Sequence, residues 1–292
     1  MKIIWTMTWK ELLRKRVLLL TIILTALFLL GFWFIASAIG GEAPTTITDS
    51  VNSEAMIQQF MLGMLILMFG FLFAGFVLAF LSIFSSFSAI AGEAEQGIMQ
   101  AMLPRPIPRW KWYTGRWLGY VSFGLVYALI LYSLILWITD VHASIPRDPL
   151  VLAQAFLLFA SVVPLLVTVS MFGSGYLSSI ANGVVMTMLY GAGWLGGMIG
   201  KIIGSVGLEP GPLQTLSNIT GILSLIMPAD GLHRKMQAVL FSYEDIQGIV
   251  PVRMDGPFGI GDVPSTMFVV YAAVYTAVLF AIGMRRFIRK DL

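Results

Sequence analysis

The sequence predicts an all-α protein that crosses a membrane six times. Of its 292 residues, 58% are hydrophobic and 11% are charged, whereas about a quarter of an ordinary soluble chain is charged. Several apolar stretches are long enough to form spanning helices, which need about 20 residues each. A soluble domain cannot bury this much apolar surface. We therefore expect one polytopic membrane domain over residues 1–292.

Five of the predicted spans have clear limits, and one apolar segment is longer than a bilayer is thick. Residues 57–91 carry no charge; we assign Phe60–Leu81 to the membrane as span two and the serine-rich Ser82–Ser88 to a helical extension toward the cytosol. Span one exceeds the apolar core of a cleavable signal peptide and is expected to remain in the protein. The other spans are Val17–Ile39, Trp117–Thr139, Leu150–Phe172, Ala181–Ile203 and Thr266–Met284.

The distribution of basic residues gives the predicted orientation. Lys and Arg collect before span one, between spans two and three, and after span six. With six spans these segments share one face, which the positive-inside rule assigns to the cytoplasm. We therefore expect a multi-pass protein of the cell membrane with both termini in the cytoplasm. The 13 of 18 basic residues on this face are Lys2, Lys10, Arg14, Lys15, Arg16, Arg105, Arg109, Lys111, Arg116, Arg285, Arg286, Arg289 and Lys290.

The composition also argues against several functions. The chain has no Cys and two His, His142 and His233, so disulfides and Cys- or His-based metal clusters are not expected. It has no GxxxxGK[ST] phosphate loop, so we expect no ATP hydrolysis, no catalytic residue and no bound cofactor in this chain. We interpret the spans as free of ionisable side chains, which argues against a self-powered, ion-coupled carrier. The net charge of +3 reflects basic residues at membrane ends and not nucleic-acid binding.

The N-terminal segment Ile3–Arg16 predicts an amphipathic helix. Trp5 and Trp9 recur at helical spacing, and Lys10 and Arg14 lie on another face. Such a helix lies in the membrane interface, with its indoles at headgroup depth and its cations in water. We expect these four residues to anchor it. Its role is either a lipid anchor alone or an elbow helix that also borders the docking site of a cytoplasmic partner.

The polar segment between spans two and three predicts one short helix over Glu93–Leu103, which stops before Pro104. Ile98 and Met102 are four residues apart and would share a face. Gly97 permits close approach by a partner's backbone. An ordinary interfacial helix is the alternative. We favour a docking element, and expect Glu93, Gly97, Ile98 and Met102 to contact a cytoplasmic protein.

Residues 204–265 are predicted to form a long external connection. Leu213–Met227 within it is apolar but short for a span, and we expect an interfacial or re-entrant helix there. The length of the connection leaves room for an external partner or cargo. The glycine run Gly191–Gly200 predicts close helix packing, with a gate as the alternative. The expected organisation is 1–16 elbow helix, 17–203 spans one to five, 204–265 external connection and 266–292 span six with a cytoplasmic tail.

These features together resemble the type-2 permease subunits of ABC transporters, of the exporter kind. Residues 9–16 resemble the family's elbow segment. Gly115 and Arg116, with Gly119, resemble a Gly-Lys-x-x-Gly motif at the start of span three, with Arg in place of Lys. A narrower likeness, to permeases that assist the maturation of copper enzymes, rests on the Pro-Ala-Asp of residues 228–230 and Arg234. Further similar stretches are Glu93 with Gly97, Leu103-Pro104, Pro108-Arg109, Met227–Asp230 and Arg289–Leu292.

The resemblance implies a permease that forms the substrate pathway as a dimer with a second copy or a homologue. It implies separate cytoplasmic ATPase subunits, which bind the ATP and magnesium, and it makes the Glu93–Leu103 segment the coupling helix. It also implies re-entrant helices that close the external end before span six. A different class of function fits the same residues: a membrane scaffold or signal-transmitting subunit that relays the ATPase state to an external partner without transport.

Overall fold

The computed structural model describes residues 1–14, 16–40, 53–97, 108–143, 148–205, 212–241 and 263–289, and over these ranges its regular elements are all helices. The helices are α1 (Lys2–Arg14), α2 (Arg16–Gly40), α3 (Ser53–Ser86), α4 (Ala91–Glu95), α6 (Arg109–Ala143), α7 (Pro149–Ser174), α8 (Ser179–Ser205), α9 (Pro212–Ile226), α10 (Ala229–Leu240) and α12 (Thr266–Arg289).

Six of these helices, α2, α3, α6, α7, α8 and α12, are long and apolar enough to cross a membrane. The six-span prediction is therefore confirmed. The helices run past the predicted limits because a helix does not end where the hydrocarbon does. The start of α7 has a clear local cause: Asp148 caps it by accepting a hydrogen bond of 2.9 Å from the Leu150 amide, and Pro149 follows at the first helical position, where its missing N–H costs nothing.

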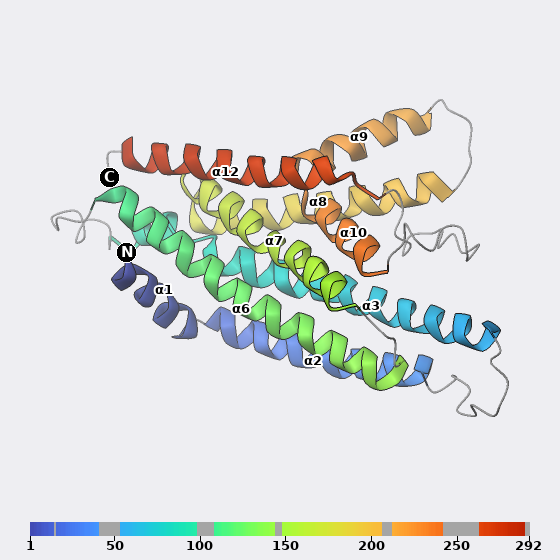
Figure 1. Ribbon diagram of the computed structural model, residues 1–292. Coiled ribbons are helices and arrows are strands. Elements are labelled where there is room, and N and C mark those ends of the chain that lie inside the picture. Colours follow the sequence, from blue (N-terminus) through green and yellow to red (C-terminus); the bar gives the residue numbers. More distant parts are fainter. Residues whose placement is uncertain are drawn as a thin grey trace.

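The spanning helices form two groups with α7 between them (Figure 1). On one side lie α2, α3 and α6, and on the other α8 and α12, with the shorter α9 beside α8. Helix α7 contacts α3, α6, α8, α10 and α12. Large side chains such as Phe71, Tyr120 and Phe159 are fully buried where α3, α6 and α7 meet. The peripheral α2 keeps side chains such as Leu27 and Phe34 exposed, as suits a lipid-facing surface.

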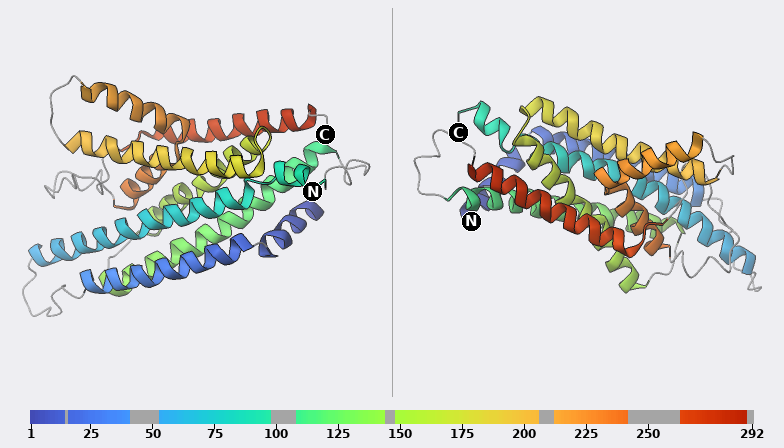
Figure 2. Two further views of the ribbon diagram at one scale, coloured as in Figure 1. Left: turned by 180° about the vertical axis from the view of Figure 1, so that it is seen from behind. Right: turned by 90° about the horizontal axis from the view of Figure 1, so that it is seen from above.

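Both termini lie at one end of the helix bundle, together with α1 and α4 (Figure 2). There the Arg109 guanidinium donates a hydrogen bond of 3.1 Å to the carbonyl of Ile288, so α6 and α12 meet at their polar ends. The Arg286 guanidinium lies 3.6 Å from the ring centroid of Tyr176. Six crossings are an even number, so the chain must end on the side of the membrane on which it begins. The assignment of this end to the cytoplasm stays a prediction.

The opposite end holds the segment that was hardest to interpret from sequence. The helix expected at Leu213–Met227 is present as α9. The next helix, α10, had no predicted residue range, although the family resemblance implied more than one helix before span six. It packs against α7 and also contacts α8, α9 and α12, and so it covers the bundle at this end. The rest of the predicted external connection, residues 206–211 and 242–262, lies outside the described ranges.

Candidate functional site

Helix α1 is fastened to α6 by its two tryptophans. The indole N–H groups of Trp5 and Trp9 both donate to the hydroxyl oxygen of Ser122, each at 2.8 Å. Ser122 in turn donates to the carbonyl of Gly119 at 3.1 Å. A Cβ at Gly119 would lie 2.6 Å from the Cβ of Thr8, so only glycine allows α1 this close to α6. The N-terminal helix is therefore a fixed part of this end.

The predicted anchor residues divide into two kinds. Trp5 and Trp9 hydrogen-bond to α6, although Trp5 remains 38% exposed, whereas Lys10 and Arg14 are exposed and make no hydrogen bond or ion pair with α6 in the described part of the chain. Trp9 also packs edge-on against Phe123, with ring centroids 5.2 Å apart. The anchoring of α1 in the membrane interface stays a prediction. Sequence spacing did not indicate that the indoles would bind a serine of a spanning helix.

A buried cluster of charges joins α1, α4 and α6. Arg116 on α6 is 6% exposed and Glu93 on α4 is 7% exposed. The guanidinium forms ion pairs with the carboxylates of Glu93 and Glu11, the latter on α1. It also lies 5.5 Å from the ring centroid of Trp112. One cation thus holds two acidic side chains from two other helices, and we call Glu11, Arg116 and Glu93 the charge cluster.

The predicted single helix over Glu93–Leu103 is wrong. Helix α4 ends at Glu95, and Gly97 has φ +70°, a left-handed conformation in which glycine stops a helix at little cost. Glu93 and Gly97 therefore do not share a helical face. Ile98 and Met102, the other two expected docking residues, lie outside the described ranges.

Glu93 was expected to contact a cytoplasmic protein, but its side chain is buried. Its carboxylate is turned inward to Arg116 and not toward a partner's surface. The exposed side chains of this segment, within residues 91–97, are those of Ala94, Glu95 and Gln96. The sequence contained a signal for this arrangement, since the acidic residue and the basic residue both belong to the pattern that resembles the permease family. Helical spacing alone could not reveal that they pair.

Helix α4 is also held from the side of α7 and α8. The hydroxyl oxygen of Ser174 accepts hydrogen bonds from the amides of Ile90 and Ala91, at 3.0 and 2.9 Å. The carboxylate of Glu95 accepts two more from Ser179, one from its amide and one from its hydroxyl, both at 2.9 Å. These contacts satisfy amides that a helix start leaves unpaired. Helix α4 is therefore held by α7 and α8 as well as by α1 and α6.

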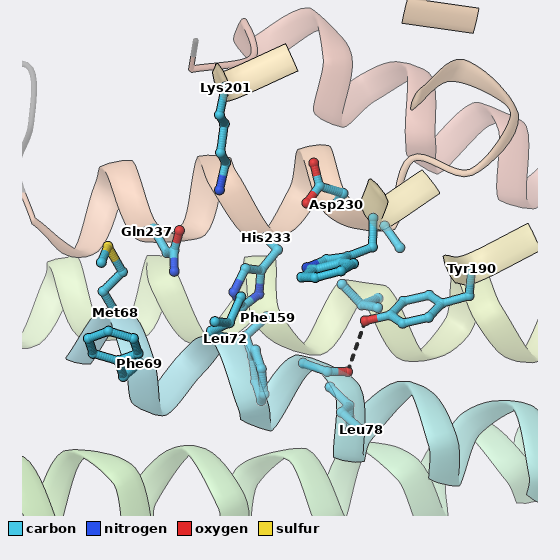
Figure 3. Close-up of a pocket in the computed structure, with 14 residues that line it drawn as sticks. Met68, Phe69, Leu72, Leu78, Phe159, Tyr190, Lys201, Asp230, His233 and Gln237 are labelled. Atoms are coloured by element: carbon cyan, nitrogen blue, oxygen red, sulfur yellow. Dashed lines mark hydrogen bonds between the residues drawn. The ribbon is translucent and has the colours of Figure 1, made fainter. Parts of the chain in front are cut away.

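A second candidate site lies near the opposite end, between α3, α8 and α10. Lys201 of α8 and Asp230, His233 and Gln237 of α10 line one pocket (Figure 3). Asp230 pairs with the Arg234 guanidinium at 2.9 Å. Lys201 lies within the predicted fifth span, so the expectation of spans free of ionisable side chains is wrong at this residue. The other charged residues near the pocket, Asp230 and Arg234, belong to α10, which packs against the spanning helices α7 and α8.

The glycine run of α8 allows the chain from α9 to α10 to pack closely against α8. A Cβ at Gly193 would lie 3.0 Å from Met227, and one at Gly197 would lie 1.9 Å from a carboxylate oxygen of Asp230. Gly196 approaches Leu223 in the same way, with a Cβ distance of 3.3 Å. The packing interpretation of Gly191–Gly200 is thus confirmed at these three positions.

Comparison with known proteins also identifies the chain as similar to ABC transporter permeases. The chain is 31% identical over 133 residues to the protein described as probable ABC transporter permease protein NosY of Pseudomonas aeruginosa. That match covers 44% of this chain and 42% of the relative's length. A family described as ABC-2 family transporter protein matches residues 5–292. With six apolar helices and a family match over nearly its whole length, the chain belongs to the ABC-2 family of transporter membrane proteins.

Proposed function

We propose that this chain is the membrane-spanning subunit of an ATP-driven exporter, which forms the substrate pathway as a dimer and is moved by separate cytoplasmic ATPase subunits. Membership of the ABC-2 family supports a permease. The export direction, the dimer and the ATPase contact are our inferences. The chain itself carries no phosphate loop, so the energy has to come from a partner.

One observation carries the proposal: the segment that leaves α3 is tied to three other parts of the fold. The charge cluster joins α4 to α1 and α6, and Ser174 and Ser179 join it to the α7–α8 connection. An ordinary loop would be free to move alone. A segment connected to four helices transmits a push from a cytoplasmic partner to the whole bundle.

The docking surface is expected on the exposed side of this segment. Glu95 and Gln96 are exposed, although the Glu95 carboxylate also accepts hydrogen bonds from Ser179, and Gly97 redirects the chain after α4. Ile98 and Met102 remain proposed contacts. Glu93 is assigned a different part from the one expected: it positions α4 through Arg116, and the ATPase touches the residues that follow.

Purification of the tagged chain from its native membranes tests the proposal. We expect an ABC ATPase to copurify with it and to hydrolyse ATP. Glu95→Lys/Gln96→Lys should lower the amount bound, whereas Lys2→Gln, an exposed change on α1, should leave it unchanged. Retention of the chain with no ATPase in mild detergent and in nanodiscs would contradict the proposal.

The scaffold or signalling alternative predicts the same copurification. The two functions differ in the response to substrate: an exporter's ATP hydrolysis rises when its substrate is added, and the substrate accumulates on one side of a vesicle. A relay subunit would instead respond to an external protein. The exporter is favoured here because a pocket with convergent polar groups lies near the end opposite the ATPase contact.

A further inference from the structure

We propose that the pocket between α3, α8 and α10, here called the outer pocket, binds the carboxylate or phosphate group of an amphipathic anion. This inference rests on the proposed function, because it gives a chemical class to the substrate of the same pathway. The pocket brings together charged groups, an unpaired ring nitrogen and apolar walls.

The cation of the outer pocket is Lys201. It comes from α8 and points toward the side chains of α10 (Figure 3). Ionisable residues this close to the hydrocarbon are costly and generally mark a substrate or ion path. Among the described residues that line the pocket, Asp230 is the single acid, and Arg234 already pairs with it at 2.9 Å. A ligand anion would give the Lys201 ammonium a counter-charge of its own.

His233 supplies a second group that lacks a partner. Its Nε2 is buried and has no hydrogen bond among the described residues. The ring lies against α3, where a Cβ at Gly75 would be 3.5 Å away. In the tautomer with its proton on Nε2, the imidazole donates to an oxygen placed in the pocket. A buried donor without an acceptor costs free energy, and a carboxylate or phosphate oxygen removes that cost. A cationic ligand would offer no acceptor to this N–H.

The remaining walls suit an apolar body attached to the anion. Met68, Phe69 and Leu72 of α3 and Trp194 of α8 line the pocket beside the polar groups. The Tyr190 hydroxyl donates to the carbonyl of Gly75 at 3.2 Å, which joins α8 to α3 at one end of the pocket. The void is about 30 Å³, more than the roughly 10–15 Å³ that one water needs. It is therefore sized for the carboxylate or phosphate oxygens alone, and the body of the ligand would contact the apolar walls outside this void.

Binding of a matched pair of probes tests this inference. The full chain in phosphatidylcholine nanodiscs, without ATP or ATPase, is titrated calorimetrically with 4-phenylbutyrate and with the uncharged 4-phenylbutanol. We expect the carboxylate to bind about tenfold more tightly or better, which is the effect of one charge-assisted hydrogen bond. Lys201→Gln should abolish that preference, and Lys201→Arg should keep it. Lys2→Gln, which removes the same charge at the other end of the protein, should change nothing.

Two further arms complete the experiment. Gln237→Leu removes a second polar group from the pocket and should weaken the carboxylate probe, so the test survives if Lys201→Gln fails to fold. Nanodiscs with phosphatidylglycerol distinguish the sources of the anion. Competition that depends on Lys201 would assign the site to a lipid phosphate, and no competition would assign it to a free anion.

Equal affinity for the two probes would overturn the inference, as would a carboxylate preference that survives both Lys201→Gln and Gln237→Leu. Because no ATPase is present, failure here leaves the proposed coupling intact. Conversely, a chain that binds the probe but never binds an ATPase would refute the proposed function alone.

Discussion

Loss of the Arg116 charge should destabilise the end of the bundle at which we propose that the ATPase docks. Arg116 and Glu93 are 6% and 7% exposed, so the pair is buried. Removing one partner of a buried pair costs about 3–5 kcal/mol, because the other charge is left uncompensated. The Glu11 side chain is 37% exposed, and its share should be about 0–1 kcal/mol because water screens it. We therefore expect Arg116→Leu to destabilise the protein severely. Arg116→Lys keeps the charge and should destabilise it only mildly.

A double-mutant cycle separates positioning from direct contact. The ATPase is titrated against the permease in nanodiscs with Glu93→Leu, Arg116→Leu and both changes together. Each single change should weaken binding by about tenfold or more, or about 1.4 kcal/mol, since a displaced α4 no longer presents its exposed side. The double change should cost less than the sum, because two apolar side chains replace the buried pair, and the Glu11 carboxylate that is left is 37% exposed and screened by water.

Additive losses would refute this reasoning. They would mean that Glu93 touches the ATPase itself and that Arg116 acts separately. Glu95 provides the comparison, since it is exposed and its carboxylate accepts hydrogen bonds from Ser179 alone among the described residues. Glu93→Lys should weaken the ATPase complex more than Glu95→Lys, because it places a cation against the buried Arg116. Equal losses would contradict a positioning role.

Three other changes test separate parts of the structure. Gly97 has a left-handed conformation that costs most other residues about 1–2 kcal/mol, so Gly97→Ala should weaken ATPase binding by up to about that amount. Asn tolerates this conformation better, and Gly97→Asn should lose less. Equal ATPase affinities in the titrations would show that φ is unimportant there. Gly197→Ala should lower the unfolding temperature, since its Cβ would lie 1.9 Å from Asp230 and overpacking costs about 1–3 kcal/mol; Gly191→Ala, with nothing within 4 Å, should not, and matching temperatures would count against the contact. A cysteine at position 106 of this Cys-free chain should react with impermeant reagents only from the cytoplasmic side, and labelling from outside would reverse the orientation.

The spans could be predicted because each follows from its own composition. Twenty apolar residues without charge cross a bilayer wherever they lie, and α9 was found by the same reasoning. The limits of α4 could not be predicted in this way. Gly97 ends the helix through a backbone conformation, and the pattern of Ile98 and Met102 suggested continuation. Tertiary contacts at Ser174 and Ser179 then hold the short helix that remains.

The partners of the charges were the other part that sequence alone left open. Glu93 and Arg116 were each identified within a motif, but their pairing depends on how α4 meets α6. The outer pocket escaped prediction for a related reason. Lys201 is one basic residue at the end of an apolar helix, and Asp230 and His233 belong to α10, which carries no long apolar run. Only the packing of α10 on α7 and α8 brings these groups together.

A cytoplasmic ATPase is proposed to bind at the exposed side of α4. The most direct measurement is site-specific crosslinking, because a single cysteine can be placed at any position of this Cys-free chain. Gln96→Cys and Ser265→Cys are both exposed and lie at opposite ends of the bundle. With a short thiol-to-amine crosslinker, we predict a covalent product with the ATPase for Gln96→Cys and none for Ser265→Cys. The same yield from both positions, or a product from Ser265→Cys alone, would contradict the account.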